Sequence, residues 1–296
     1  MARIGIVGLG IIGTAVARHL LEDGDEVVGF DIDTGRGEVL TSLGGVAVAS
    51  PRETADRSDL IFTAVASLGA LSVIATGPDG LASSTRRGFA LVDFSTLPLQ
   101  EKETVRAALA AVGIPMVDCP ISGTGAQVEA RDAVFMASGD PAAVTAVLPI
   151  LRRLGKGACN VGRFGDGSKM KFIANLMVAI HSAVAGEALA LAEKAGLDPA
   201  QVLEVISSGA GNSRMWEVRG PLIVERRYQE PTARVSMMIK DTHLITDFAR
   251  SVGAATPLLD AARGLYEQAA ASGLADWDVA AVHALIATME PGGAGG

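Results

Sequence analysis

The pattern of apolar and polar positions changes once along the chain. In the first half, short β-branched or apolar runs alternate with amphipathic segments, which is typical of a parallel sheet whose strands are separated by helices. From about residue 168 to residue 288, apolar positions recur at three- and four-residue spacings, which is typical of helices. The pattern therefore predicts an α/β part followed by an all-helical part.

The first part, residues 1–162, is predicted to form a Rossmann-like, doubly wound and mostly parallel sheet. Its strands are expected at residues 3–8, 26–30, 60–64, 90–94, 115–118, 135–138 and 160–162. Helices are expected after Gly13 and at residues 51–56, 67–75 and 99–112. Ligands of such a sheet lie beyond the carboxyl ends of its strands, so the loops at those ends are candidate site segments.

The second part, residues 163–290, is predicted to be an all-α domain. Its first helix is expected from Ser168 to Lys194 and, at ~1.5 Å per residue, is ~40 Å long, enough to join the two domains as an interdomain helix. The apolar positions predict that it is largely buried. Further helices are expected at residues 200–207, 215–224, 235–252, 257–272 and 279–288, and the tail 291–296 (PGGAGG) is expected to be disordered and flexible.

A glycine turn, Gly8-x-Gly10-x-x-Gly13, joins the first strand to the first helix, and Asp31 ends the second strand 18 residues later. Glycines permit a tight turn and the close approach of a pyrophosphate to the helix N-terminus, while the acid accepts hydrogen bonds from a ribose diol. This context predicts a dinucleotide site. Asp31 favours NAD because its carboxylate would repel the 2′-phosphate of NADP, although Arg36 could reach such a phosphate.

A lysine and an asparagine share one face of the long helix. Lys171 and Asn175 lie four residues apart on it, so an amine and an amide point to the same side. Partial burial lowers the pKa of a lysine towards neutrality, where the amine can exchange protons. The alternative is that Lys171 and nearby Lys169 are ordinary first-turn lysines whose charged ends lie in water.

The segment from Gly162 to Asn175 reads G-x-x-G-x-G-x-x-x-K-x-x-x-N. It resembles the catalytic signature of the β-hydroxyacid dehydrogenase family, the relatives of 3-hydroxyisobutyrate and 6-phosphogluconate dehydrogenases. Four more segments resemble family motifs in family order, namely the glycine turn, Ser95-Thr96, Asp118 to Gly125 and Lys240-Asp241. The resemblance thus spans nearly the whole chain.

The resemblance implies a role for each matching residue. Lys171 is the implied general acid/base, and Asn175 helps to fix the substrate oxygen. Thr124 stands where the family usually has a second glycine, so Gly123 is the firmer match. The implied substrate-binding residues are Ser122, Gly123 and Thr124, and the implied cofactor-binding residues are Gly8, Gly10, Ile11, Ile12, Gly13, Asp31, Thr96 and Lys240.

A glycine-containing loop, residues 207–213, is followed at once by Arg214 and Trp216. An arginine beside a tryptophan after such a loop suits recognition of an anion or a planar group. We therefore expect Arg214 to contact a second polar group of a substrate larger or more polar than 3-hydroxyisobutyrate. The alternative is an ordinary surface pair between Arg214 and Glu217.

Composition narrows the class of partner. The chain has 296 residues, 49% of them hydrophobic and 20% charged, with a net charge of -8, which argues against nucleic acid or an anionic membrane surface as the main partner. Polar and glycine positions interrupt the uncharged run 60–78, which is expected to be a strand and a short helix rather than a membrane span. Cys119 and Cys159 lack metal-ligand spacing, so no metal site is predicted and a cytoplasmic setting is expected.

These observations predict an NAD(P)-dependent oxidoreductase that acts on the CH–OH group of a small anionic β-hydroxy acid, such as 3-hydroxyisobutyrate or the acid related to tartronate semialdehyde, with NAD preferred. The resemblance also implies a homodimer or homotetramer. One alternative is an imine or ketone reductase on the same scaffold, although such relatives generally lack the motif lysine. The other is a non-catalytic, nucleotide-responsive binding module.

Overall fold

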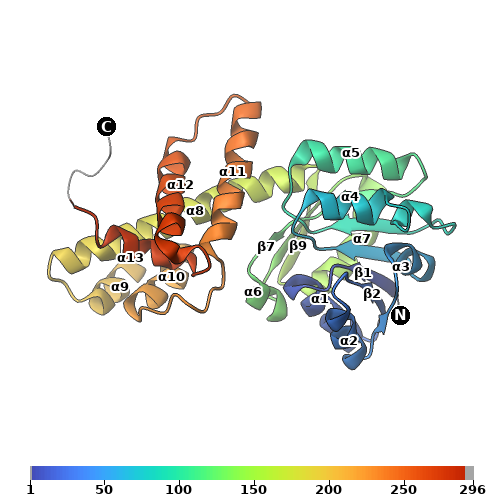
Figure 1. Ribbon diagram of the computed structural model, residues 1–296, viewed down its shortest axis with the longest axis horizontal. Helices are drawn as coiled ribbons and strands as arrows, with labels where there is room; N and C mark the ends of the chain where they lie inside the picture. Colours follow the sequence, from blue (N-terminus) through green and yellow to red (C-terminus); the bar gives the residue numbers. More distant parts are fainter. Residues whose placement is uncertain (1, 291–296) are drawn as a thin grey trace. The chain divides into compact units, whose positions relative to one another are not determined.

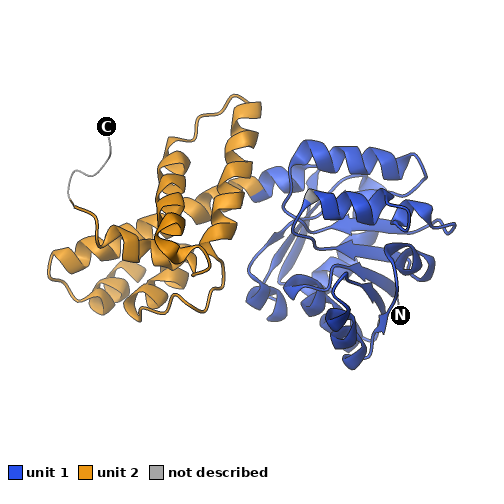
Figure 2. Cartoon of the chain, viewed as in Figure 1, with its two compact units in different colours: residues 1–171 blue, residues 172–296 orange. Residues whose placement is uncertain are grey.

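The computed structural model describes residues 2–290 of the chain. These residues form two compact units, the first ending at Lys171 and the second beginning at Phe172 (Figure 2). The boundary lies inside one helix, α8 (Asp166–Lys194). The division by function, a dinucleotide-binding domain over 1–162 and a helical substrate domain over 163–290, stays a prediction. The tail 291–296 lies outside the described residues.

Within the described residues, the first unit is built on a nine-stranded sheet of order β3-β2-β1-β4-β5-β6-β8-β7, with β9 paired to β8. Strands β1 to β6 pair in parallel, whereas β8 runs antiparallel to β6 and β7. The bounds are β1 Arg3–Val7, β2 Glu26–Phe30, β3 Val46–Ala47, β4 Leu60–Thr63, β5 Ala90–Asp93, β6 Met116–Asp118, β7 Ile121–Ser122, β8 Val134–Ser138 and β9 Gly157–Gly162.

Alternate residues of the central strands enter two separate cores, because successive side chains of a strand point to opposite faces of the sheet. Phe62 and Val92 lie in one core, and Ile61 and Leu91 lie in the other. All four side chains are buried. Burial on both faces explains why these strands read as continuous apolar runs rather than as alternating patterns.

Helices cover both faces of the sheet (Figure 1). Helices α1, α2, α6 and α7 complete the core that contains Phe62, and α3, α4 and α5 complete the core that contains Ile61. The predicted doubly wound, mostly parallel α/β architecture is confirmed. The helix bounds are α1 Ile11–Glu22, α2 Thr34–Ser42, α3 Pro51–Arg57, α4 Leu68–Thr76, the short 3-10 helix η1 Leu81–Ser83, α5 Leu99–Ala110, α6 Gly125–Glu129 and α7 Pro141–Leu154.

The elements of the second unit, up to residue 290, are helices, as predicted. One buried cluster contains Phe172 and Tyr266, and another contains Trp216 and Tyr228. After α8, the bounds are α9 Pro199–Ser207, α10 Arg214–Val224, α11 Val235–Ser251, α12 Pro257–Ala269, the π-helical turn η2 Ala270–Leu274, the 3-10 helix η3 Val279–Ala281 and α13 Val282–Ile286.

Helix α8 is less buried than its apolar sequence predicts. Ile173 is 58% exposed and Leu191 is 69% exposed, and both belong to a stripe of apolar side chains along one side of the helix. By length and composition alone α8 could cross a membrane, but core helices pass the same test, and 44% of its apolar window is buried in the protein. We call these residues the α8 stripe: Ile173, Met177, Val184 and Leu191.

Candidate functional site

The glycine turn between β1 and α1 has the close packing that a dinucleotide site requires. Gly8 has a φ of 97°, and a Cβ there would lie 2.6 Å from the carbonyl oxygen of Ala64. A Cβ on Gly13 would lie 1.9 Å from the carbonyl oxygen of Gly8. Since both contacts are closer than atoms can approach, only glycine fits at either position, as the tight turn of a dinucleotide site needs.

The N-terminus of α1 lies at this turn. Gly10 is the N-cap residue and brings no side chain over the first N–H groups of the helix. Ile11, the first helical residue, is 79% exposed, whereas Ile12 is half-buried against the core. First-turn N–H groups and the helix dipole favour an anion here, so these residues fit a cofactor pyrophosphate.

Asp31 lies beside the turn, at the end of β2. Its carboxylate accepts hydrogen bonds from the backbone N–H of Leu9 at 2.7 Å and of Asp33 at 2.9 Å. The guanidinium of Arg36 approaches it to 3.3 Å, and a Cβ on Gly10 would lie 3.5 Å from the same Arg36 nitrogen. The carboxylate of Asp31 and the guanidinium of Arg36 thus both border the glycine turn.

The loop after β5 is fixed by hydrogen bonds at its first residue. Ser95 donates its hydroxyl to Asp93 at 2.7 Å and accepts a hydrogen bond from the backbone N–H of Val65 at 2.9 Å. Thr96 follows directly and is half-buried. The ends of β4 and β5 are therefore held together where Thr96 leaves the sheet.

The predicted substrate segment leaves β6 after Asp118 and forms β7, whose last residue is Ser122. Gly123 has a φ of 149°, which favours glycine, and a Cβ there would lie 3.1 Å from Ala133. A Cβ on Gly125 would lie 2.3 Å from the side chain of Ile11. The substrate segment therefore packs directly against the first residue of α1, beside the predicted cofactor site.

Thr124 also has a structural function. It is the N-cap of α6, where its hydroxyl accepts a hydrogen bond from the backbone N–H of Gln127 at 3.3 Å. The side chain of Gln127 in turn accepts from the N–H of Thr124 at 2.9 Å. This capping box accounts for a threonine at the position of the family's second glycine.

The two lysines near the start of α8 have different surroundings. Lys169 forms an ion pair with Asp166 at 2.8 Å, as expected of a first-turn surface lysine. Lys171 is half-buried and precedes Asn175 by one helical turn. Asn175 is only 9% exposed. The alternative of two equivalent surface lysines therefore describes Lys169 better than Lys171.

Asn175 is oriented by the predicted Lys240-Asp241 pair. Its side-chain amide donates a hydrogen bond of 2.8 Å to the carboxylate of Asp241 on α11. The ammonium of Lys240 lies 3.9 Å from the other oxygen of Asp241, and the Lys240 side chain is about half exposed. The structure thus brings Asn175, Asp241 and Lys240 together within the second unit.

Arg214 lies at the start of α10 and pairs with Glu217 at 3.1 Å, with 66% of its side chain exposed. This is the surface pair that the sequence offered as the alternative, and the predicted role of Arg214 in substrate binding stays a prediction. Arg219, one turn later, forms a buried ion pair of 3.0 Å with Asp278. Arg219 is therefore enclosed by the protein rather than exposed as Arg214 is.

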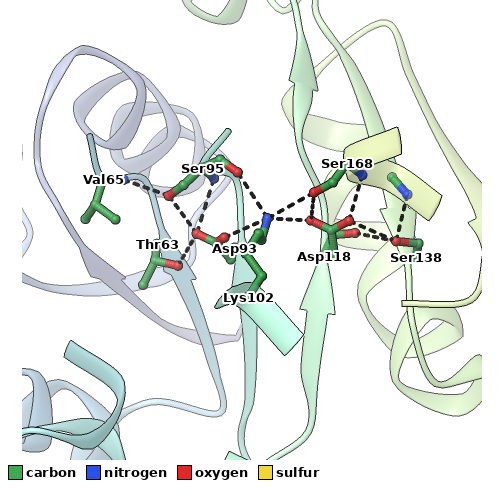
Figure 3. A network of polar contacts seen from close by, with 9 residues as sticks. Thr63, Val65, Asp93, Ser95, Lys102, Asp118, Ser138 and Ser168 are labelled. Atoms are coloured by element: carbon green, nitrogen blue, oxygen red, sulfur yellow. Dashed lines mark hydrogen bonds and ion pairs between the residues drawn. The ribbon is translucent and has the colours of Figure 1, made fainter. Parts of the chain in front are cut away.

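One polar network was not foreseen from the sequence. Lys102, on α5, is fully buried and pairs with Asp93 and Asp118, which end β5 and β6 (Figure 3). Its local sequence, QEKET, is that of an exposed helix face, so no local signal indicates burial. Among residues 2–290, no group of three or more histidine, cysteine, aspartate or glutamate side chains could hold a metal ion.

Comparison with known families divides the chain into two matched segments. Residues 3–165 match the model described as the NAD binding domain of 6-phosphogluconate dehydrogenase. Residues 165–286 match the model described as NAD-binding of NADP-dependent 3-hydroxyisobutyrate dehydrogenase. Together the two matches include every residue predicted for the site.

Individual relatives match over almost their full length. L-threonate dehydrogenase of Cupriavidus necator is 33% identical over 291 residues, 97% of each chain. 2-hydroxy-3-oxopropionate reductase of Escherichia coli is 30% identical over 283 residues, 95% of each chain. The structure of 3-hydroxyisobutyrate dehydrogenase from Salmonella typhimurium is 31% identical, with a TM-score of 0.86 over 96% of this chain and all of that one. An imine reductase from Pseudomonas sp., at 18% identity and a TM-score of 0.57 over 95% of this chain and 98% of that one, shares the fold alone.

Proposed function

The chain belongs to the β-hydroxyacid dehydrogenase family, and on that premise we propose how its own residues carry out the reaction. It is an NAD(P)-dependent dehydrogenase that acts on CH–OH donors and interconverts a small hydroxy acid and the corresponding carbonyl compound. The nicotinamide, when bound, supplies the hydride chemistry. The protein therefore has to bind the cofactor and the substrate, orient them towards each other and transfer the proton.

The glycine turn and Asp31 are the proposed cofactor site. The N–H groups at Ile11 and Ile12 receive the pyrophosphate, and the Asp31 carboxylate accepts hydrogen bonds from the ribose diol. NAD is therefore the preferred cofactor. Arg36, which already lies 3.3 Å from Asp31, can turn to a 2′-phosphate and retain some affinity for NADP. The family pattern adds Thr96 and Lys240 to the cofactor-binding residues.

Lys171 is the proposed general acid/base. Its amine takes the proton from the oxygen of the substrate hydroxyl as the hydride leaves the carbon that bears this hydroxyl, and it returns the proton to the oxygen in the reverse reaction. The observation that carries this proposal is that Asn175, one turn further on the same face, is held by Asp241 at 2.8 Å. An amide fixed in that way can hold the substrate oxygen beside the Lys171 amine.

The segment around Gly123 is the proposed carboxylate site. Ser122 supplies a hydroxyl donor, and the backbone at Gly123 supplies an N–H donor. The N–H of Thr124 already donates to Gln127, so Thr124 is proposed to donate the proton of its hydroxyl, whose oxygen accepts the N–H of Gln127. Anchoring the carboxylate decides which carbon of the substrate faces the nicotinamide, as orientation requires. Because Gly125 packs on Ile11, the proposed carboxylate site and the proposed cofactor site are in direct contact.

The preferred acid is proposed to be more polar than 3-hydroxyisobutyrate. Two relatives are named for small polar acids, L-threonate and 2-hydroxy-3-oxopropionate. Arg214 is the residue proposed to contact the additional polar group, in exchange for its exposed pair with Glu217.

The experiment is a substrate panel followed at the NADH absorbance. Purified protein is mixed with NAD or NADP and with L-threonate, 3-hydroxyisobutyrate or 2-(hydroxymethyl)glutarate, and the reverse reaction is run with 2-hydroxy-3-oxopropionate. We expect turnover with at least one polar hydroxy acid. Tight NADH binding without turnover of any acid would favour a binding module, and reduction of an imine that does not need Lys171 would favour an imine reductase.

The chain is proposed to form a homodimer or homotetramer, in which a second copy of the chain contacts the α8 stripe. Four exposed apolar side chains on one side of a helix form the kind of surface that oligomers bury. Leu191→Glu should shift the mass measured by light scattering towards the monomer, while Lys194→Glu, on the same helix, should not. An unchanged mass in the Leu191 variant would contradict this interface. We propose a cytoplasmic setting, which the free cysteines Cys119 and Cys159 favour. We also propose no nucleic-acid or membrane partner, because the net charge of -8 would repel a polyanion or an anionic surface.

A further inference from the structure

A fully buried lysine connects three segments of the first unit. The ammonium of Lys102 lies 2.8 Å from the carboxylate of Asp93, pairs with the carboxylate of Asp118, and donates to the backbone oxygen of Ser95 at 3.0 Å (Figure 3). All three charged side chains are 0% exposed. Burial alone would lower the pKa of Lys102, but the carboxylates of Asp93 and Asp118 outweigh it and raise this pKa, so the lysine stays charged.

On one side, Asp93 organises the ends of β4 and β5. Its carboxylate accepts hydrogen bonds from the hydroxyl of Thr63 at 2.9 Å and from the hydroxyl of Ser95 at 2.7 Å. Ser95 in turn accepts from the N–H of Val65. Thr96, which is proposed to bind the cofactor, therefore follows directly after Ser95, a residue that is hydrogen-bonded to this network.

On the other side, Asp118 holds the start of α8. Its carboxylate accepts the backbone N–H of Ser168 at 2.7 Å and the hydroxyl of Ser168 at 2.8 Å. Ser138 donates to the backbone oxygen of Asp118 at 3.1 Å and accepts the N–H of Gly167 at 2.9 Å. An anion at a helix N-terminus satisfies unpaired N–H groups, so Asp118 caps α8 from the sheet.

The two ends of this network reach the proposed reacting groups by short chain distances. Ser168 precedes Lys171 by three residues, and Asp118 precedes Ser122 by four residues. Ser168 and Lys171 lie on the same helix, α8, and only two residues separate Asp118, the end of β6, from β7, which carries Ser122. A shift of Lys102 would therefore move the cofactor loop, the carboxylate segment and the proton-transfer helix relative to one another.

Stability alone does not account for three buried charges. Replacing a buried ion cluster by apolar side chains of similar volume is often neutral or stabilising, because desolvating the charges offsets their attraction. This network also connects three segments of the proposed site, and that connection gives it a geometric use. Reaction rates are sensitive to such geometry, since a misplacement of 1 Å costs about 100-fold.

We propose that Lys102 is a positioning residue for hydride transfer. Through Asp93 and Asp118 it fixes the loop of Thr96, the segment of Ser122 and the helix of Lys171 in one arrangement. The proposal rests on the roles proposed above for these residues. Lys102 itself is enclosed by the protein and acts only through its partners.

The test separates positioning from stability. Lys102→Met alone leaves two buried carboxylates facing each other, so the main variant is Lys102→Met combined with Asp93→Asn, which removes one charge of each sign. The control is Lys156→Met, whose lysine forms an exposed pair with Asp132. For each protein we would measure the melting temperature, the NADH dissociation constant by fluorescence, and kcat and KM for the best hydroxy acid well below the melting temperature.

We expect the double variant to bind NADH within about threefold of wild type while kcat falls about 10- to 100-fold, whereas Lys156→Met behaves as wild type. A purely structural role would lower the melting temperature and leave kcat unchanged, and that result would overturn the proposal. If the double variant does not fold, Ser168→Ala tests the proposal instead. It keeps the backbone bond to Asp118, and it must lower kcat severalfold for the proposal to stand.

A Lys171→Met variant assayed in parallel distinguishes the two proposals. Retained activity in that variant would overturn the proposed role of Lys171, and the positioning argument with it. Wild-type kinetics in a folded Lys102 variant, beside an inactive Lys171→Met, would overturn only the role of Lys102.

Discussion

Asn175 donates a hydrogen bond of 2.8 Å from its side-chain amide to the carboxylate of Asp241. The two residues lie 66 positions apart in the sequence and meet where α8 passes α11 in the second unit. The bond decides which way the amide of Asn175 points. Asp241 is therefore as much a part of the proposed site as the asparagine that it orients.

Asp241→Asn should lower kcat/KM for the preferred acid about 10-fold or more, because a hydrogen bond to a charged group contributes ~1.5 to 3 kcal/mol. Asp247→Asn is the matched control, since Asp247 is exposed on the same helix and pairs only loosely with Arg250 at 3.6 Å. Steady-state kinetics of both variants check the prediction. Equal losses in the two variants would show that Asp241 does not orient Asn175 for the reaction.

Asp31→Ala should weaken NADH binding about 10- to 100-fold, because it removes the ribose acceptor and also the acceptor of the Leu9 N–H. NADPH binding should weaken less, since Arg36 is released from its pair with Asp31. Arg36→Ala is the complementary variant and should weaken NADPH more than NADH. Titration of both cofactors by fluorescence gives the dissociation constants of NADH and NADPH for each variant. A wild-type preference for NADPH would contradict the assignment of Asp31 as the residue that favours NAD.

Arg214→Met should raise KM for the preferred polar acid about 10-fold more than KM for 3-hydroxyisobutyrate, because it removes a charged hydrogen-bond donor from one substrate only. Glu217→Gln breaks the same surface pair and keeps the cation, so it should leave both KM values near wild type. If Arg214→Met changes both substrates equally, or neither, the arginine is only a partner of Glu217.

The sequence predicts elements whose signals are local. Strands β1, β2 and β4 follow from buried β-branched runs, and α9 follows from its Asp198-Pro199 start. Helix α7 carries the same kind of start, Asp140-Pro141, and could have been predicted. Strands β3 and β7 have two residues each, too few for periodicity. The exposure of α8 could not be predicted, because periodicity does not tell what covers an apolar face.

In the candidate site, too, the residues that could be predicted are those whose signal lies within one short segment. The glycine turn, Asp31 and the Lys171–Asn175 spacing are readable because each lies within one short segment. The capping box of Thr124 and Gln127 was also readable from its spacing. The burial of Lys102 could not be predicted, since its partners come from two different strands and its neighbours in sequence are polar. Only the folded chain brings those three charges together.

His283 should make the second unit less stable in mild acid. Burial lowers the pKa of His283, Glu193 raises it, and Arg226, whose guanidinium donates to Nδ1 at 2.8 Å, lowers it further, with a net decrease. The unfolded chain therefore binds more protons than the folded one below about pH 6.5, so stability is present above that pH and is lost as the pH falls towards the folded pKa.

Chemical denaturation at about pH 7.5 and about pH 5.5 checks this, with the window set by the unfolded histidine pKa. His283→Gln should lose less unfolding free energy between the two values than wild type, although it is less stable at the higher one. His243→Gln, at an exposed position, controls for the loss of a histidine as such. An equal loss in His283→Gln and wild type would contradict the prediction.

The most direct test of the proposed role of Lys171 compares two lysines on one helix. Lys169 and Lys171 lie two residues apart on α8, and only Lys171 shares the face of Asn175. Each is replaced by Met, and kcat for the best hydroxy acid is measured from single turnovers alongside the NADH dissociation constant. We predict that Lys171→Met loses at least about 100-fold in kcat with NADH affinity nearly unchanged, while Lys169→Met stays within a few-fold of wild type. A Lys171→Met enzyme within a few-fold of the wild-type rate would contradict the proposed role of Lys171.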